Sequence, residues 1–137
     1  MLAYIIYQSD LVDTIRTETA AAFDDSGRVD YHYLEDSCPR LGAVWYETIR
    51  MTAYSASVRY ITEDTVIGGK ILRKHNRVMV PYRQLHFNEE IFGKGVHQFD
   101  PERFIRDPAL QKSSSWRPFG GGVTMCPGRY GWFWRKA

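Results

Sequence analysis

Apolar residues recur at helical spacing through the first part of the chain. Residues 1–7 are apolar on nearly all sides, which is typical of a buried helix end. Ser9 and Asp10 then offer an N-cap for a following helix. Leu11, Val12, Ile15 and Thr19 follow with helical spacing. Residues 24–27 are turn formers, and we expect them to end it.

A second amphipathic pattern predicts a helix that begins near Ser37. Pro39 falls in its first turn, where the N–H that proline lacks would have no helical partner. The apolar face of this helix carries Leu41, Val44, Trp45 and Ile49. The helical pattern continues to Arg50 and then changes character.

Alternating and β-branched residues follow Arg50, and they predict short strands. Residues 57–62 form the first, and Gly68–Gly69 is a two-residue turn signature for a β-hairpin between residues 65–67 and 70–72. The remaining predicted elements are a strand at residues 77–80 that ends at Pro81 and a short helix over 82–87. Residues 88–115 are predicted to be mostly coil, and so long a loop-rich stretch needs something to organise it.

Composition and charge narrow the class of protein. The chain has 137 residues, 44% of them apolar and 15% aromatic, which gives one domain with a modest core and suits packing around a large planar cofactor. A net charge of +2 with scattered basic residues gives no support to nucleic-acid binding. Met1–Tyr7 lacks the basic start and cleavage site of a signal peptide and is far too short to span a bilayer.

The cysteines and histidines do not predict a multidentate metal site. Cys38 and Cys126 are far apart and form no Cys-x-x-Cys pair, so neither a disulfide framework nor a zinc site is expected. None of the four histidines has the spacing of a metal-binding motif. We interpret His86 as a structural residue with its hydrogen bonds satisfied.

The segment from Phe119 to Gly128 presents a single cysteine in a glycine-dense loop. Glycines let a backbone approach a bulky partner closely and adopt positive φ. Exposed amides around Cys126 would favour the thiolate, which is the form that binds metal. The alternative is a buried cysteine that behaves as a small apolar residue.

Two further motifs accompany this loop, Glu47-Thr-Ile-Arg50 and Pro101-Glu-Arg-Phe104. In this order and with these distances, the three motifs resemble those of the cytochrome P-450 superfamily, in particular its fungal microsomal members. The resemblance covers the chain to about Arg129. It implies a mainly helical fold with a small β-sheet, and it makes residues 1–137 a partial domain from the C-terminal part of a longer protein, without the central helix, the substrate loops and the membrane anchor.

The resemblance also implies which residues contact haem. Cys126 would be the axial ligand of the iron in haem b, and Phe119 would pack near its sulfur. Gly120, Gly122 and Gly128 would allow close approach, and Pro127 and Gly128 would begin a helix. Arg59 and Arg117 would contact the propionates, together with Thr124, which stands where the family commonly has a basic residue. A solvent-exposed charge is the alternative for each arginine.

The same resemblance assigns a supporting role to Glu47, Arg50 and Arg103. Glu47 and Arg50 are three residues apart and share a face of their helix. Arg103 would close an ionic network that locks the coil onto the core and holds the cysteine loop, without contacting substrate. The alternative is an exposed ion pair on the surface, which would contribute less than about 1 kcal/mol to the stability of the fold.

By lineage, the resemblance implies a haem-thiolate monooxygenase. Such an enzyme inserts one atom of dioxygen into a small lipophilic substrate, takes electrons from an NADPH-dependent reductase and works on the cytosolic face of the endoplasmic reticulum membrane. No catalytic residue is assigned in this chain. The alternative is a non-catalytic haem-binding or structural fragment from an incomplete gene product.

Overall fold

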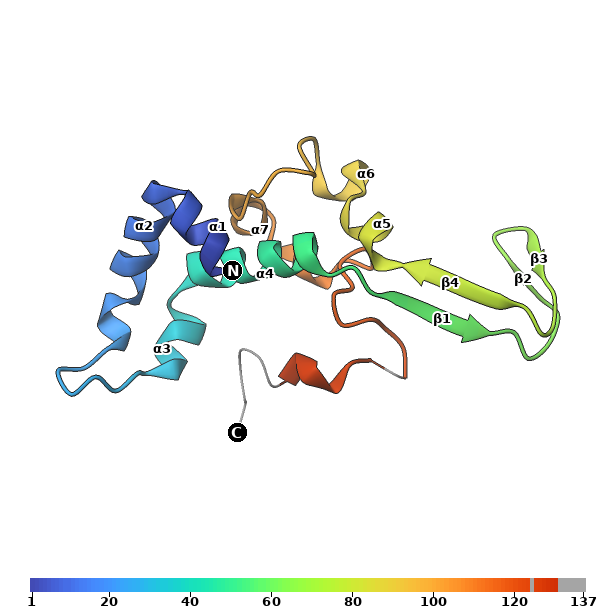
Figure 1. Ribbon diagram of the computed structural model, residues 1–137, viewed down its shortest axis with the longest axis horizontal. Coiled ribbons are helices and arrows are strands. Elements are labelled where there is room, and N and C mark those ends of the chain that lie inside the picture. Colours follow the sequence, from blue (N-terminus) through green and yellow to red (C-terminus); the bar gives the residue numbers. More distant parts are fainter. Residues whose placement is uncertain (124, 131–137) are drawn as a thin grey trace.

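The computed structural model describes residues 1–123 and 125–130. Its first part is helical and matches the predicted periodicity in outline. The elements are α1 (Leu2–Tyr7), α2 (Ser9–Thr19), the 3-10 turn η1 (Ala20–Ala22), α3 (Tyr31–Asp36) and α4 (Pro39–Thr52). α4 lies near the centre of the molecule, with α2 and α3 to its left, the strands and α5 (Tyr82–His86) to its right, and α7 (Glu102–Arg106) above it (Figure 1).

The helix α4 follows the sequence prediction closely. Pro39 occupies its first turn, and the helix ends at Thr52 because Ala53 adopts an extended conformation. Its residues are buried on most sides, including the polar side chains of Glu47, Thr48 and Arg50. α4 is therefore an internal helix whose polar residues must find partners within the protein.

The strands form two antiparallel pairs along one arm of the molecule. They are β1 (Ala56–Tyr60), β2 (Thr65–Ile67), β3 (Lys70–Leu72) and β4 (Arg77–Pro81). β1 pairs with β4, and β2 pairs with β3 across the predicted Gly68–Gly69 turn, where both glycines have positive φ. The arm extends away from α4, and the β2–β3 hairpin forms its tip (Figure 1).

The segment predicted to be coil contains several short helices. They are α5 (Tyr82–His86), α6 (Glu89–Phe92), α7 (Glu102–Arg106) and the 3-10 turn η2 (Pro108–Lys112). α5 was expected, whereas the prediction of coil over residues 88–115 was wrong for the other three. Side-chain caps begin two of these turns: Asn88 accepts a hydrogen bond from the Glu90 amide, and Asp107 accepts one from the Ala109 amide.

A small apolar core joins these short helices to α4. Its buried members are Ala43, Phe92, Val96, Phe104 and Leu110. Tyr46 and Trp116 pack against it with their rings edge to face, 5.4 Å between centroids. Because most core residues come from residues 88–115, packing against α4 supplies the organisation that this irregular stretch requires.

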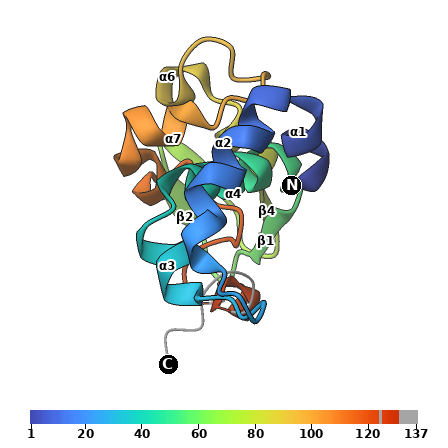
Figure 2. The same ribbon diagram turned by 90° about the vertical axis from the view of Figure 1, so that its left-hand side faces the viewer.

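The N-terminal helices differ from the prediction in two respects. Only Ile5 is buried in α1, whereas Leu2, Ile6 and Tyr7 are exposed, so residues 1–7 are not a buried helix end. α2 begins at Ser9 with no side-chain cap, so Ser9 and Asp10 do not form the expected N-cap. α1, α2 and α3 lie on the same side of α4, seen from that side in Figure 2. Within the described residues, no helix has both the length and the apolar character needed to cross a membrane.

Candidate functional site

Glu47 and Arg50 form a two-pronged ion pair inside α4. Arg50 Nε donates to Glu47 Oε2 at 2.7 Å, and Arg50 Nη2 donates to Glu47 Oε1 at 2.8 Å. Both residues are 0% exposed to solvent. The side chains meet because residues three apart share one face of a helix, as predicted. A parallel pair of charge-assisted hydrogen bonds fixes the orientation of the guanidinium group.

The remaining donors of Arg50 bind backbone carbonyl groups from the irregular segment. Nη1 donates to the His86 carbonyl at 2.7 Å, and Nη2 donates to the Val96 carbonyl at 2.8 Å. The rings of Phe87 and Phe92 lie 5.2 and 5.3 Å from the Arg50 Cζ atom. Arg50 therefore connects α4 to two points of the chain that lie 36 and 46 residues further along.

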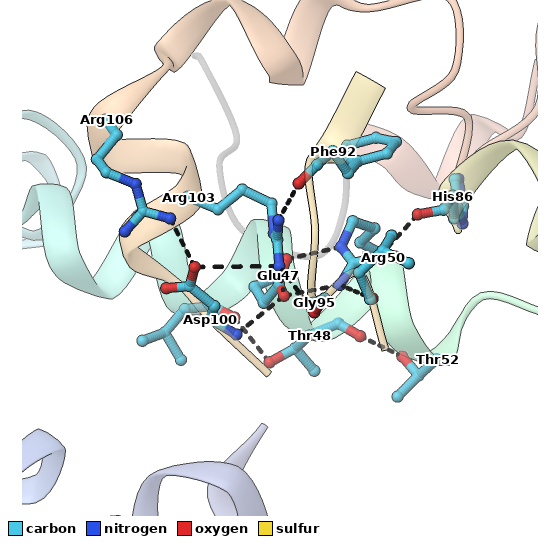
Figure 3. Close-up of polar contacts among 12 residues, drawn as sticks. Glu47, Thr48, Arg50, Thr52, His86, Phe92, Gly95, Asp100, Arg103 and Arg106 are labelled. Atoms are coloured by element: carbon cyan, nitrogen blue, oxygen red, sulfur yellow. Dashed lines mark hydrogen bonds and ion pairs between the residues drawn. The ribbon is translucent and has the colours of Figure 1, made fainter. Parts of the chain in front are cut away.

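Arg103 joins this network from α7, as the motif predicted. Its Nε lies 3.5 Å from Glu47 Oε1, within ion-pair distance but without a hydrogen bond. Nη1 donates to the Phe92 carbonyl, and Nη2 donates to the Gly95 carbonyl at 3.5 Å. Figure 3 shows the three charged side chains meeting above α4. The structure thus brings together the three residues of the predicted network.

Asp100 completes the network and was missed in the sequence. Its backbone N–H donates to Glu47 Oε1 at 3.0 Å, and its carboxylate accepts a 2.6 Å bond from Arg106 Nη2 (Figure 3). Glu47 consequently faces two guanidinium groups and one backbone amide. A buried carboxylate with this many donors is well compensated for its loss of hydration, so removing one partner is costly.

His86 is fully buried beside this network, and its ring takes part in a hydrogen bond. Its Nε2 accepts from the backbone N–H of Arg117 at 2.9 Å, while Nδ1 makes no hydrogen bond of normal geometry among the described residues. Burial, and next the positive charge of Arg50, lower the pKa of His86 to about 4. The ring is therefore neutral near pH 7.

A backbone hydrogen bond closes the cysteine loop between the two ends of its motif. The Cys126 amide donates to the Phe119 carbonyl at 3.0 Å. Gly120 and Gly122 have φ of +79° and +74°, the left-handed region that glycine adopts readily. Cys126 is exposed, and a Cβ atom added to Gly128 would lie 3.3 Å from its Sγ atom. A side chain at position 128 would therefore crowd the thiol, and glycine avoids this.

The two arginines predicted to contact propionates lie in different surroundings. Arg117 precedes the loop, and its Nε donates to the Ser114 carbonyl at 3.0 Å. Its guanidinium group folds back over the loop, where Nη1 would lie 3.5 Å from a Cβ on Gly121. Arg59 is exposed on β1, and its Nη1 donates to the Val58 carbonyl at 3.0 Å. Thr124 lies outside the described residues, as do residues 131–137, and Pro127–Tyr130 form a 3-10 turn, η3.

Phe119 lines two hollows beside α4. The larger hollow has a volume of about 420 Å³, and several of its walls are aromatic. Those aromatic walls come from Trp45, Tyr46, Trp116 and Phe119. The smaller, about 300 Å³, is also lined by Trp45 and Phe119. The half-buried Phe119 therefore lies beside α4 at the start of the loop, and its packing near the cysteine sulfur stays a prediction.

The donor set fits a cofactor that needs one thiolate ligand from the protein. Cys126 is exposed, and Gly122 and Gly128 on either side of it place no side chain beside the thiol. Among the residues that the structure describes, no three histidine, cysteine or carboxylate side chains gather as a metal site. Haem would meet this description, because the porphyrin supplies four of the iron's ligands and one cysteine thiolate can supply a fifth.

The chain matches the model of the family described as cytochrome P-450 over residues 1–130. It is 32% identical over 142 residues to cytochrome P-450 monooxygenase poxD of Penicillium oxalicum, covering 93% of this chain and 28% of that protein. It is 30% identical over 132 residues to abscisic acid 8'-hydroxylase 3 of Oryza sativa subsp. indica, covering 93% of this chain and 26% of the relative. It is also 25% identical over 129 residues to the bifunctional cytochrome P-450/NADPH–P-450 reductase ALT2 of Alternaria alternata, covering 92% of this chain and 12% of that protein.

These matches confirm the resemblance based on the three motifs. The chain spans about a quarter of the length of the first two of these relatives. The mainly helical fold with a small antiparallel sheet agrees with the expected fold class. The chain belongs to the cytochrome P-450 family.

Proposed function

We propose that this chain supplies the cysteine loop of a haem-thiolate monooxygenase and binds haem b through Cys126. The observation that carries this proposal is the exposed Cys126 on a closed glycine loop, next to Gly128, where any side chain would crowd the sulfur. A thiolate at this place would bind the iron from one side. When bound, haem supplies the dioxygen chemistry, and a thiolate ligand favours O–O cleavage.

The residues around the loop would hold the porphyrin. Phe119 would pack near the sulfur, and Gly120, Gly122 and Gly128 would let the backbone approach the ring. Arg117 and Arg59 would neutralise the propionates, and Thr124 would donate a hydrogen bond to one of them. Support for Arg117 comes from its position beside the loop, where its guanidinium group already lies against Gly121.

The network of Glu47, Arg50 and Arg103 would hold the loop in place without contacting substrate. Its three side chains are buried, and their outward hydrogen bonds go to backbone carbonyls of residues 86–96. That segment leads toward the loop through α7 and η2. The network would therefore act on cofactor binding through the position of the backbone.

The activity of the whole protein would be insertion of one oxygen atom of dioxygen into a small lipophilic substrate. Electrons would come from an NADPH-dependent reductase, a partner that one relative carries in the same chain, as its name states. The resemblance to fungal microsomal members of the family implies a protein that would work on the cytosolic face of the endoplasmic reticulum membrane. Residues 1–137 would be one part of that enzyme's domain.

A haem titration of the full chain tests this proposal. Binding should saturate at one haem per chain and should produce the absorption spectrum of thiolate-bound ferric haem. Cys126→Ala should abolish that spectrum, whereas Cys38→Ala should keep it, because Cys38 is 2% exposed and its Sγ donates to the Glu18 carbonyl at 3.4 Å. An identical spectrum for the unmodified chain and Cys126→Ala would overturn the role of Cys126. Haem binding without turnover would instead indicate a non-catalytic unit.

A further inference from the structure

His86 lies between the buried ionic network and the segment that begins the cysteine loop. Its backbone carbonyl accepts the 2.7 Å hydrogen bond from Arg50 Nη1. Its ring Nε2 accepts the 2.9 Å hydrogen bond from the Arg117 amide. One residue thus binds the network through its main chain and the loop segment through its side chain. These partners are 36 residues before it and 31 residues after it.

The connection continues from Arg117 to Cys126 through backbone hydrogen bonds. The Arg117 carbonyl accepts from the Gly120 amide at 3.1 Å, which forms a turn at the start of the loop. The Phe119 carbonyl, inside that turn, accepts from the Cys126 amide at 3.0 Å. Hydrogen bonds and short stretches of chain therefore link Glu47 to Cys126, and in this series the His86 ring crosses from α5 to the loop segment.

A second contact from α5 reinforces the same junction. Tyr82 lies four residues before His86, so both side chains share one face of the short helix. The Tyr82 hydroxyl would lie 3.1 Å from a Cβ atom placed on Gly120, a residue whose φ is +79°. The face of α5 that carries Tyr82 and His86 therefore packs directly on the turn at Arg117–Gly120.

The hydrogen bond from Arg117 fixes the state of the His86 ring. A backbone amide can only donate, so Nε2 must carry a free lone pair, and the proton of the neutral ring must be on Nδ1. The opposite tautomer would set two N–H groups against each other. The ring must therefore present a hydrogen-bond acceptor at Nε2. A side chain that only fills space would not have this requirement.

We infer that His86 is a positioning residue that couples the Glu47–Arg50 network to the Cys126 loop through its Nε2 atom. Its effect on function rests on the proposed role of Cys126 as haem ligand. The coupling itself is a property of the polypeptide and can be measured without haem. Failure of the coupling would therefore leave the haem proposal intact, and failure of haem binding would leave the coupling intact.

The first test reads the tautomer in the unmodified full chain. Nitrogen-15 NMR at neutral pH distinguishes a protonated ring nitrogen from a free one. The inference predicts a neutral His86 with Nδ1 protonated and Nε2 free. A ring protonated on Nε2, or a charged ring, would overturn the inference, because neither can accept the Arg117 hydrogen bond. This measurement needs no substitution and does not depend on whether a variant folds.

The second test compares two substitutions by amide hydrogen exchange. His86→Phe keeps a buried ring without an acceptor, and His86→Gln places an amide oxygen near the position of Nε2. In His86→Phe the Arg117 amide should exchange roughly tenfold faster, since a buried amide loses its partner. The Gly120 and Cys126 amides should also exchange faster. His86→Gln should restore much of the protection.

A control variant separates coupling from general loss of stability. Leu110→Ala removes buried apolar volume from the core without touching the His86 contacts. It should accelerate exchange in the α4 core and in the loop alike, whereas His86→Phe should act on the loop more than on α4. Equal acceleration everywhere in His86→Phe, or unchanged exchange at Cys126, would overturn the coupling.

Discussion

Replacing Arg50 by lysine should destabilise the fold strongly although the positive charge is kept. Arg50 makes four hydrogen bonds of 2.7–2.8 Å, two to Glu47 and one each to the His86 and Val96 carbonyls. A lysine has one nitrogen and cannot match the planar geometry of these acceptors. It would leave at least one buried acceptor without a donor, at about 1–3 kcal/mol each. We therefore expect a loss of about 3 kcal/mol in the free energy of unfolding.

The assay is urea denaturation of the full chain, followed by far-UV circular dichroism. Arg73→Lys is a matched control, because Arg73 Nη1 contacts Asp64 Oδ2 at the same 2.7 Å distance but with side chains that are 66% and 52% exposed. An exposed pair of this kind is screened by water, so Arg73→Lys should leave the midpoint nearly unchanged. If Arg50→Lys and Arg73→Lys shift the midpoint equally, the argument from burial is refuted.

Three further predictions concern pH, the loop and the thiols. Because the pKa of His86 is lowered from 6.5 to about 4, its contribution to stability is complete above pH 6.5 and is lost as the pH falls toward 4. Denaturation across this range should show a loss of about 3 kcal/mol that is absent in His86→Gln. Gly120→Ala should unfold more readily, because of its φ of +79° and the Tyr82 hydroxyl, and Tyr82→Phe should relieve only part of this effect in a double-variant cycle. A thiol reagent should label the exposed Cys126 faster than the buried Cys38, because burial first and then the charge of Glu18 raise the pKa of the Cys38 thiol. Equal labelling rates in the native chain would contradict this.

The sequence predicted the elements that have a strong local signal. The apolar periodicity with Pro39 identified α4, and the pair of glycines at 68–69 identified the hairpin between β2 and β3. α6 and α7 were missed because helices of four or five residues have too few positions to show a period. They are held by tertiary packing, since Phe92 and Phe104 are core residues.

The contacts of the candidate site in which one side chain binds another were predictable from the sequence. Glu47 and Arg50 share a helix face at a spacing visible in the sequence, and the motif around Arg103 pointed to the third member of the network. The partners that are backbone carbonyls were not predictable, because every residue carries one. His86 was interpreted as a structural residue with its hydrogen bonds satisfied, which is wrong for Nδ1, since that atom makes no hydrogen bond of normal geometry among the described residues. Its link to Arg117 depends on the spatial position of a backbone amide 31 residues away.

The exposure of α1 could not be predicted from the sequence either. An apolar run indicates that burial is favourable, but it does not say which surface covers it. In the structure Ile5 is buried while Leu2, Ile6 and Tyr7 face outward. A pattern that is apolar on nearly all sides was therefore an unsafe guide to the position of this helix.

The most direct test of the central claim is the carbon monoxide difference spectrum of the haem-loaded, reduced chain. If Cys126 is the axial ligand, the Soret band should be shifted to the red as expected for thiolate-bound haem. The band should be lost in Cys126→Ala and kept in Cys38→Ala. A spectrum like that of free haem in the unmodified chain, unchanged by Cys126→Ala, would contradict the assignment of this loop as a haem-thiolate site.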